Sequence, residues 1–204
     1  EKERGELSEF TVECNPGTVD LAYLKMLRRH GVNRLLFGVQ TFNDDLLKRI
    51  GRIHTGAQAK EAMKLAREAD FHNVSMDLIY GLPEETQAML RHDLETMISL
   101  EPEHISIYGL QLEEGTAFAS MQDLGKLHLP DEDIVEKMYD TMTSFLPQHG
   151  YARYEISNFA RPGFMSRHNL SYWQDIPYLG LGAAAHSYLL GQRYENEQDI
   201  LAYI

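Results

Sequence analysis

The sequence predicts an α/β fold in which helices alternate with the strands of a parallel sheet or barrel. Segments of strand length, rich in apolar residues, alternate with longer segments of helical periodicity. Each strand-helix unit takes about thirty residues, as in a chain of βαβ crossovers. The short apolar run within Asn73–Pro83 ends in Gly-Leu-Pro, which is typical of a buried strand followed by a tight turn.

Four strands and three helices make up this alternation. We expect the strands at Glu9–Asn15, Arg34–Val39, Asn73–Pro83 and His104–Leu110, and the helices at Val19–His30, Ala57–Asp70 and Thr86–Leu100. Thr18 is a candidate N-cap for the first helix, and Gly31 follows the basic last turn of that helix, where helices often stop. Each helix has apolar residues three and four positions apart, which predicts one buried face.

The alternation ends after the fourth strand. The following chain predicts, in order, a polar connection at Gln111–Pro130, a helix at Asp131–Leu146, a strand at Tyr151–Ser157, and an irregular segment to Tyr188 that is rich in aromatic residues and glycine. We therefore expect residues 1–112 to form one domain and residues 113–204 a C-terminal extension of mixed α+β structure.

Composition excludes several classes of protein. The chain has 204 residues, 43% of them hydrophobic, which is enough to bury a core. The net charge of −12 argues against nucleic acid as a partner, and we expect no transmembrane segment and no signal peptide. A single cysteine, Cys14, rules out an internal disulfide and suggests a reducing, cytoplasmic location. The chain begins without a methionine and ends at Ile204 without a helix-stop signal, so we expect a fragment of a longer protein.

Polar side chains recur at the predicted carboxyl ends of the strands, where parallel sheets bind ligands. Four strand ends contribute them: Glu13 and Asn15, then Gln40 with Arg52 in the loop beyond, then Asp77, then Gln111 and Glu113. A carboxylate within a buried strand is costly unless something pairs with it. The set predicts a site for a polar small molecule that carries both signs of charge. Alternatively, each residue hydrogen-bonds only to a neighbouring loop.

Other candidate motifs are weaker. The Cys14 thiol has no second cysteine nearby, and we expect it to be structural. The stretch Gly180–Ala185 fits G-x-G-x-x-A, but it lacks the strand, helix and acidic residue of a dinucleotide site, so we expect close packing of small residues, with His186 packed beside them. The cluster His168–Trp173 combines a histidine with two aromatic side chains, which could line a flat macrocycle or form a core corner.

Several motifs together resemble one family, the radical S-adenosylmethionine (SAM) proteins around oxygen-independent coproporphyrinogen III oxidase (HemN). They are ECNPG from Glu13, GVNR from Gly31, FGVQTF from Phe37, GRIH from Gly51 and DLIYGLP from Asp77. Three more resemble the HemW branch in particular: YEISNFA from Tyr154, HNLSYW from His168 and GLGAAAHS from Gly180. The resemblance covers nearly the whole chain.

The resemblance implies an incomplete TIM-like (β/α)6 barrel that binds SAM and a [4Fe–4S] cluster. Family members hold the cluster on a CxxxCxxC loop, and they contact SAM with a GGGTP loop. Neither loop is present in this sequence, so we expect both before Glu1 and expect no activity from the fragment alone. The positions that match SAM contacts of the family are Glu13, Gln40, Arg52, Asp77 and the main chain near Gly109.

The family divides between two functions. The HemW branch binds haem and is regarded as a chaperone that delivers it to respiratory haem proteins, which favours His168, Asn169, Tyr172 and Trp173 as haem-binding residues here. The alternative is a coproporphyrinogen III oxidase, which converts two propionates to vinyl groups by radical chemistry. Setting the resemblance aside, a TIM-like acid–base hydrolase or aldolase that uses Asp77 and Glu13 also fits. Haem or a porphyrin is the expected ligand in the first two cases, and a homo-oligomer is compatible with all three.

Overall fold

The computed structural model describes residues 8–204 and divides into two compact units, of which the first ends at Met165 and the second begins at Ser166. The predicted boundary near residue 112 was based on the change in sequence pattern. The structure instead continues the first unit through the helix and hairpin that follow that residue. The division into a barrel part, residues 1–112, and a C-terminal extension, residues 113–204, therefore stays a prediction.

The first unit is built on a six-stranded sheet, which confirms the predicted α/β class. Its strand order is β1-β2-β3-β4-β6-β5, with bounds β1 Thr11–Cys14, β2 Arg34–Gln40, β3 Val74–Tyr80, β4 His104–Gly109, β6 Asn158–Ala160 and β5 Ala152–Arg153. Strands β1 to β4 are parallel, and β6 joins β4 in the antiparallel direction. The parallel part corresponds to the four strands expected from the sequence.

Six helices belong to the described part of this unit, residues 8–165. They are α1 Leu21–Arg29, α2 Asp44–Arg49, α3 Gly56–Glu68, α4 Gln87–Ser99, α5 Ala117–Asp123 and α6 Glu132–Gln148. Helices α1, α3, α4 and α6 lie where the periodicity predicts, whereas the short helices α2 and α5 fall in segments expected to be loops. The prediction of Thr18 as N-cap is wrong: Asp20 caps α1, while the Thr18 hydroxyl donates to the Asn15 carbonyl in the preceding turn.

One further prediction is corrected at the end of the unit. The strand expected at Tyr151–Ser157 is a hairpin, in which β5 pairs with β6 on either side of a turn. Tyr151 precedes this hairpin and is buried in the core, where its hydroxyl donates to the Pro102 carbonyl over 2.8 Å. Two tyrosines and an isoleucine in this run favour a strand from composition alone, and the turn interrupts it here.

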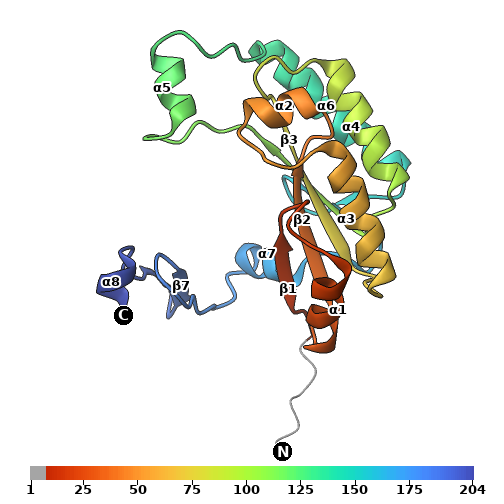
Figure 1. Cartoon of the computed structure of the whole chain (residues 1–204). Helices are drawn as coiled ribbons and strands as arrows, with labels where there is room; N and C mark the ends of the chain where they lie inside the picture. The colour runs from red at the N-terminus through yellow and green to blue at the C-terminus, as the bar shows by residue number, and fades with distance from the viewer. Residues whose placement is uncertain (1–7) are drawn as a thin grey trace, which may run out of the picture. The chain divides into compact units, whose positions relative to one another are not determined.

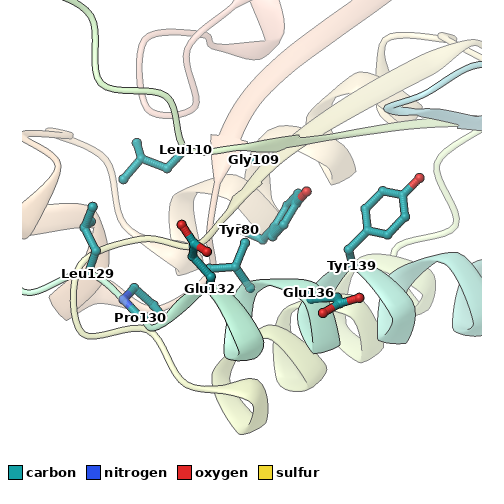
Figure 2. Close-up of a pocket in the computed structure, with 10 residues that line it drawn as sticks. Tyr80, Gly109, Leu110, Leu129, Pro130, Glu132, Glu136 and Tyr139 are labelled. Atoms are coloured by element: carbon teal, nitrogen blue, oxygen red, sulfur yellow. The ribbon is translucent and has the colours of Figure 1, made fainter.

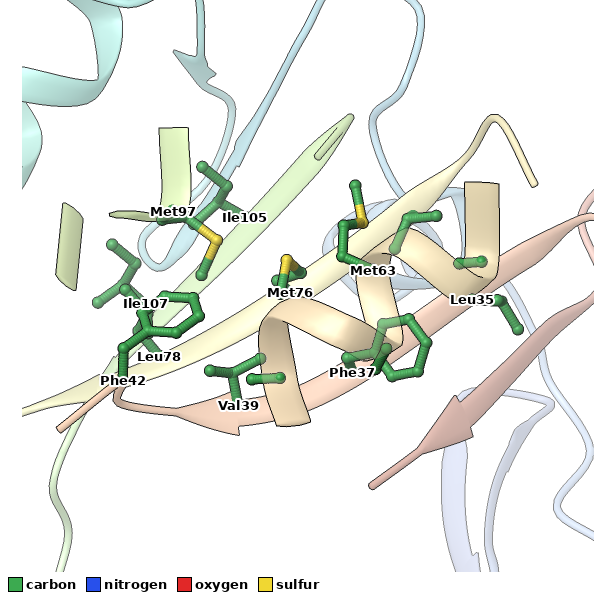
Figure 3. Packing of buried hydrophobic residues seen from close by; sticks show 14 of the residues in the cluster. Leu35, Phe37, Val39, Phe42, Met63, Met76, Leu78, Met97, Ile105 and Ile107 are labelled. Carbon is green, nitrogen blue, oxygen red and sulfur yellow. The ribbon is translucent and has the colours of Figure 1, made fainter. Parts of the chain in front are cut away.

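The two faces of the sheet have opposite character. On the face covered by helices α1, α3, α4 and α6, strand residues such as Phe37, Met76 and Ile105 are fully buried in one apolar cluster. Figure 3 shows Met63 of α3 and Met97 of α4 packing over these strand side chains, and Figure 1 shows α3, α4 and α6 along one side of the strands. We call this side the helix face, because helices supply its cover.

The opposite side of the sheet is mainly polar, and we call it the site face. Alternation along each strand places these residues on it: Thr11, Glu13, Arg34, Leu36, Gly38, Ser75, Asp77, Ile79, His104, Ser106, Tyr108, Asn158 and Ala160. Strands of a parallel sheet that is buried on both sides are usually continuous apolar runs. The polar side chains of this face therefore indicate a role other than apolar packing.

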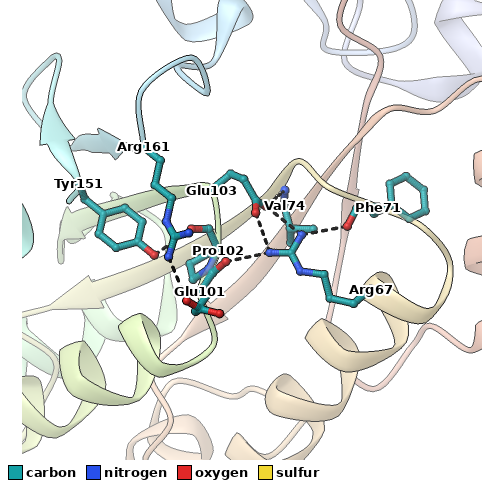
Figure 4. A network of polar contacts seen from close by, with 8 residues as sticks. All are labelled: Arg67, Phe71, Val74, Glu101, Pro102, Glu103, Tyr151 and Arg161. Atoms are coloured by element: carbon teal, nitrogen blue, oxygen red, sulfur yellow. Dashed lines mark hydrogen bonds and ion pairs between the residues drawn. The ribbon is translucent and has the colours of Figure 1, made fainter. Parts of the chain in front are cut away.

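An ion pair fixes the amino end of β3 and β4 to helix α3. Arg67 donates to both carboxylate oxygens of Glu103 over 2.8 and 3.0 Å and also to the carbonyls of Phe71 and Glu101 (Figure 4). The Glu103 carboxylate in turn accepts the backbone N–H of Val74 over 2.9 Å. This network satisfies all the groups involved and holds the strand starts in register.

The second unit is small. It contains α7 Arg167–Trp173, the antiparallel pair β7 His186–Leu189 and β8 Gln192–Glu195, and α8 Ile200–Tyr203. Helix α7 falls in a segment that the sequence predicts to be irregular. None of the helices in residues 8–204 is long and apolar enough to cross a membrane.

Candidate functional site

Two of the five residues predicted to contact SAM, Gln40 and Arg52, lie together with Asn15 near the carboxyl ends of the first two strands. Arg52 donates to the Asn15 side-chain oxygen over 3.0 Å. A Cβ atom added to Gly38 would lie 2.9 Å from Gln40 Nε2 and 3.8 Å from Arg52 Nη2 and from Asn15 Oδ1. Glycine at 38 thus leaves room for the guanidinium and the two amides to converge. Glu13 is exposed on the same face, one residue before Cys14.

Backbone geometry helps to bring Gln40 into this cluster. The pairing of β2 with β3 shifts register between Gly38 and Gln40, and Gln40 has a φ of +69°. A non-glycine residue in the left-handed region is uncommon, and bulges of this kind are frequent beside functional sites. The bulge ends the regular strand and places the Gln40 side chain, which is 7% exposed, beside Gly38.

The loop that carries Arg52 is anchored at both ends. After β2, the Thr41 hydroxyl and the Phe42 N–H donate to the buried carboxylate of Asp93 on α4, over 2.6 and 2.9 Å. Burial raises the pKa of Asp93, and both donors act against that rise. At the first residue of α3, a Cβ atom on Gly56 would lie only 2.3 Å from the Phe42 carbonyl oxygen, so this contact requires glycine. The anchored loop holds Arg52 near the strand ends.

Asp77 lies on the site face, in the middle of β3, as the sequence predicts. Its residue is half-buried, and its Oδ1 atom is buried without a hydrogen-bond partner among the described residues. Burial raises the pKa of Asp77 to about 6, while Ser106 and Arg34 act in the opposite direction and Glu13 adds to the rise. A buried oxygen without a partner costs about 1–3 kcal/mol, which a ligand that donates to it would recover.

His104 lies on the site face of β4, opposite Ser75 of β3 and two residues before Ser106, which pairs with Asp77. Its two ring nitrogens each lie 2.7 Å from a hydroxyl oxygen, Nδ1 from Ser75 and Nε2 from Tyr154. Burial, with the nearby Arg34 charge, lowers the pKa of His104 to about 3, so the imidazole is neutral. The sequence gives no sign of a role for this histidine, because a histidine at the start of a strand carries no signal of its partners.

Gly109 lies on the helix face of the sheet, whereas Glu13 and Asp77 lie on the site face. It pairs in register with Tyr80, whose hydroxyl would be 3.2 Å from a Cβ added to Gly109, and both belong to the helix-face alternation. Together they line a cavity of about 520 Å³ between the ends of β3 and β4 and helix α6. Figure 2 shows Glu132, Glu136 and Tyr139 of α6 across this cavity from Tyr80.

The aromatic motif of the second unit forms helix α7. His168 and Tyr172 lie one turn apart, with His168 Nε2 3.0 Å from the Tyr172 hydroxyl and the rings edge to face at 4.8 Å. The Tyr172 ring also meets that of Tyr178 edge to face at 4.8 Å. Trp173 is 58% exposed and Asn169 is half-buried, so the structure does not place these two in the same ring cluster.

The remaining sequence motifs fit structural roles, with one exception. Cys14 packs against the core of the helix face, and burial raises the pKa of its thiol, which disfavours the reactive thiolate. Gly180 packs against β7, since a Cβ there would lie 2.1 Å from the His186 carbonyl oxygen. His186 itself is exposed, so the expectation of a packed histidine is wrong. Its backbone, rather than its ring, makes the close contact.

Comparisons with known proteins agree on one family. Residues 1–97 match the radical SAM superfamily. The chain is 45% identical over 203 residues to the heme chaperone HemW of Bacillus subtilis, which covers 100% of this chain and 54% of that protein. It is 40% identical over 179 residues to the heme chaperone HemW of Escherichia coli, which covers 88% of this chain and 46% of that protein.

A solved structure extends the agreement to the fold. Coproporphyrinogen III oxidase (HemN) from Escherichia coli, described as a radical SAM enzyme, matches with a TM-score of 0.79 and 26% identity over 95% of this chain and 47% of that one. A mitochondrial radical S-adenosyl methionine domain-containing protein 1 from Danio rerio is 37% identical over 181 residues, which are 89% of this chain and 41% of that protein. The chain spans about half the length of the curated relatives it matches.

Proposed function

Because this chain belongs to the radical SAM superfamily and groups there with the HemW proteins, we propose that it forms part of a haem chaperone that also binds SAM and a [4Fe–4S] cluster. The observation that carries the proposal is the 45% identity to a heme chaperone HemW over the whole chain. We further propose that the complete protein delivers haem to respiratory haem proteins in the cytoplasm. The relatives named above include heme chaperones and a coproporphyrinogen III oxidase, which favours these functions over an acid–base hydrolase or aldolase.

The site face fits SAM as a ligand. SAM carries a carboxylate, an ammonium group, a sulfonium and ribose hydroxyls, so its partners must include a cation, hydrogen-bond acceptors and amides. Arg52, Gln40 and Asn15 lie together around the space that Gly38 leaves, and Asp77 presents a buried oxygen that lacks a donor. A bound SAM molecule would pair its carboxylate with the cation of this site and would donate a hydrogen bond to the unpaired Asp77 oxygen.

Each residue then has a role that follows from its chemistry. We propose that the Arg52 guanidinium binds the methionine carboxylate of SAM, since a guanidinium pairs with a carboxylate in two parallel hydrogen bonds. The carboxylates of Glu13 and Asp77 accept hydrogen bonds from the ammonium group or the ribose hydroxyls, and the Gln40 amide contributes to the same contacts. The main chain at Gly109 remains a proposed contact at the end of β4.

This chain does not fit the cluster by itself. Cluster iron is held by cysteine thiolates, and the sequence contains one cysteine, Cys14, which lies in the core packing of the helix face. Among residues 8–204, no three side chains of histidine, cysteine, aspartate or glutamate lie together in a way that could hold a metal ion. We therefore propose that the cluster ligands lie in other parts of the complete protein.

For haem, the proposal rests on helix α7. Its His168 is an exposed imidazole beside the Tyr172 ring, and the exposed Trp173 is the last residue of the helix. Imidazole is an established iron ligand, and aromatic rings pack well against a porphyrin face. We propose that His168 contacts the haem and that Asn169, Tyr172 and Trp173 form the surrounding pocket.

The SAM assignment is tested by isothermal titration calorimetry on the full-length protein with its cluster reconstituted anaerobically. Arg52→Ala should weaken SAM binding by roughly 10- to 100-fold, because it removes a charge-assisted hydrogen-bonded pair. Arg49→Ala, a charge removed from the neighbouring helix α2, serves as the matched control and should leave the affinity unchanged. Equal affinities of the Arg52→Ala variant and the wild type would refute the assignment.

The haem assignment is tested by titrating the same protein with haem and following its absorbance. His168→Ala should lose the spectral shift that accompanies axial ligation by imidazole, whereas His186→Ala, also an exposed histidine of the second unit, should retain it. A full shift in the His168→Ala variant would contradict the proposed contact. Turnover of coproporphyrinogen III by the wild-type protein, with no haem transfer, would instead favour an oxidase.

A further inference from the structure

The cavity between helix α6 and the ends of β3 and β4 shares only Gly109 with the residues proposed for SAM. Its volume of about 520 Å³ falls within the range of roughly 300–1,000 Å³ that is usual for small-molecule sites. Tyr80 and Gly109, the last residues of the two strands, line one side, and α6 lines the other. The cavity therefore has the size of a ligand site, and the chemistry of its lining indicates which ligand it fits.

Glycine at two lining positions keeps this space open. A Cβ atom on Gly109 would lie 3.2 Å from the Tyr80 hydroxyl oxygen, which is closer than side-chain atoms normally approach. Gly81 follows β3 with a φ of +77°, and a Cβ atom there would lie 3.7 Å from Val135 of α6. A side chain at either position would therefore take up room between the strand ends and the helix.

Two tyrosine rings belong to the lining, one from each side of the cavity. Tyr80 comes from β3 and Tyr139 from α6 (Figure 2). The Tyr139 hydroxyl accepts a hydrogen bond from Arg153 Nη1 over 2.6 Å, which fixes that ring, and Arg153 itself does not line the cavity. Burial raises the pKa of Tyr80, and the nearby Tyr139 adds to the rise, so the Tyr80 phenol is neutral at physiological pH. The rings therefore add aromatic surface without negative charge.

Negative charge comes instead from two carboxylates of α6. Glu132 and Glu136 are one helical turn apart, and both line the cavity. Neither forms an ion pair with any residue that the structure describes. Like charges four residues apart destabilise a helix. The start of α6 favours Glu132 through the helix dipole, but Glu136 lies beyond the first turn, where this effect has faded. A cation bound between the two carboxylates would remove their repulsion.

We propose that this cavity binds a small organic cation, with its ammonium or guanidinium group beside Glu132 and Glu136 and its apolar body against the rings of Tyr80 and Tyr139. Carboxylates and the faces of tyrosine rings both attract a cation, whereas both repel an anion. The net charge of −12 also raises the concentration of cations near the surface. This site goes beyond the proposed binding of SAM and haem and depends on neither.

Three probes with similar apolar bodies separate charge from apolar packing. They are 2-phenylethylamine, which is cationic, 2-phenylethanol, which is neutral, and 3-phenylpropionate, which is anionic. In ligand-detected NMR titrations of the full-length protein, the amine should bind roughly 5- to 30-fold more tightly than the alcohol, because a cation–π contact and an ion pair act together. The carboxylate should bind most weakly. Equal affinities for the three probes, a preference for the anion, or no binding of the amine would overturn the proposal.

Variants of α6 locate the bound amine. The double variant Glu132→Gln/Glu136→Gln keeps the shape of the lining and should lower the affinity for the amine to that for the alcohol. Asp133→Asn is the matched control, since it removes a charge from the same turn of α6 at a position outside the cavity lining. Val135→Phe should fill the space and abolish binding of both probes, with the affinity for SAM unchanged. An affinity for the amine that survives in the double variant, or falls equally in the Asp133→Asn control, refutes the assignment.

Discussion

The ion pair between Arg67 and Glu103 provides a quantitative test of what holds the parallel strands in place. Glu103→Leu leaves the Val74 N–H and the Arg67 guanidinium without their carboxylate acceptor, and the Glu103 residue is only 9% exposed. Losing a buried donor's partner costs about 1–3 kcal/mol, and a charge-assisted pair adds about 1.5–3 kcal/mol. Because the Arg67 side chain is 31% exposed, water recovers part of this loss. We therefore expect about 3 kcal/mol.

The reverse change has a similar cost for a different reason. Arg67→Leu leaves the Glu103 carboxylate with the Val74 N–H alone, and it also removes donors from the Phe71 and Glu101 carbonyls. We expect about 3 kcal/mol again. The double variant should cost about 4 kcal/mol rather than 6, because neither charge is left unpaired, which gives a coupling of about 2 kcal/mol.

Hydrogen–deuterium exchange of the peptides that cover the starts of β3 and β4 measures these energies locally. A loss of about 3 kcal/mol corresponds to exchange that is roughly 100-fold faster. Arg91→Leu is a suitable control, because it removes the solvent-exposed pair with Glu95 on α4 and should change exchange by less than about threefold. The proposed role of the pair is refuted if either single variant exchanges like this control. It is also refuted if the free-energy loss of the double variant equals the sum of the two single losses.

Three further predictions concern the site and its supports. Gly56→Ala should displace the loop after β2 and cost more than about 2 kcal/mol in unfolding by urea, since the new Cβ would lie 2.3 Å from the Phe42 carbonyl oxygen; unchanged stability would refute the requirement for glycine. Asp77 has a pKa of about 6 in the folded protein, above the ordinary value of 3.8, so its folded form binds more protons and stability should fall by up to about 3 kcal/mol as pH rises from 4 to 7. Asp77→Asn should remove that fall, and a pH profile identical to the wild type would contradict the assignment. Tyr172→Phe should leave haem bound and free His168 Nε2 from its hydroxyl neighbour, so the haem absorbance should persist; its loss would show that Tyr172 ligates instead.

The parallel part of the fold could be predicted from sequence because its signal is local. Each strand and helix from residue 9 to residue 110 has its own apolar pattern and its own stop, such as Gly31 after α1, whose φ is +90°. The hairpin β5–β6 could not, since a two-residue strand has no periodicity and its turn is set by pairing with β4. Helices α2 and α5 are also too short for a pattern, and their caps, Asn43 and Thr116, are common residues in loops as well.

The candidate site was predicted only as far as single residues can show it. Asp77 could be selected because a carboxylate is unusual in an apolar run. Arg52 could be selected because it is a cation in the loop that follows a strand end. The partners of His104 gave no such signal, because serine and tyrosine are ordinary residues in many strands and turns. What distinguishes Ser75 is the register that places it opposite His104 on the neighbouring strand, and register joins strands that are distant in sequence. That information exists only in the folded chain.

The separate faces of the sheet also limit how this protein can change during evolution. On β2, even-numbered positions face the site and odd-numbered positions face the core, while on β3 the odd numbers face the site. Substitutions can therefore alter what is bound, residue by residue, without passing through the core. Insertion or deletion of one residue within a strand would exchange the two faces beyond that point. Polar side chains such as that of Asp77 would then face the core, and apolar side chains such as that of Phe37 would face the site. Length changes in this domain should accordingly be confined to the loops, while its strands diverge by substitution alone.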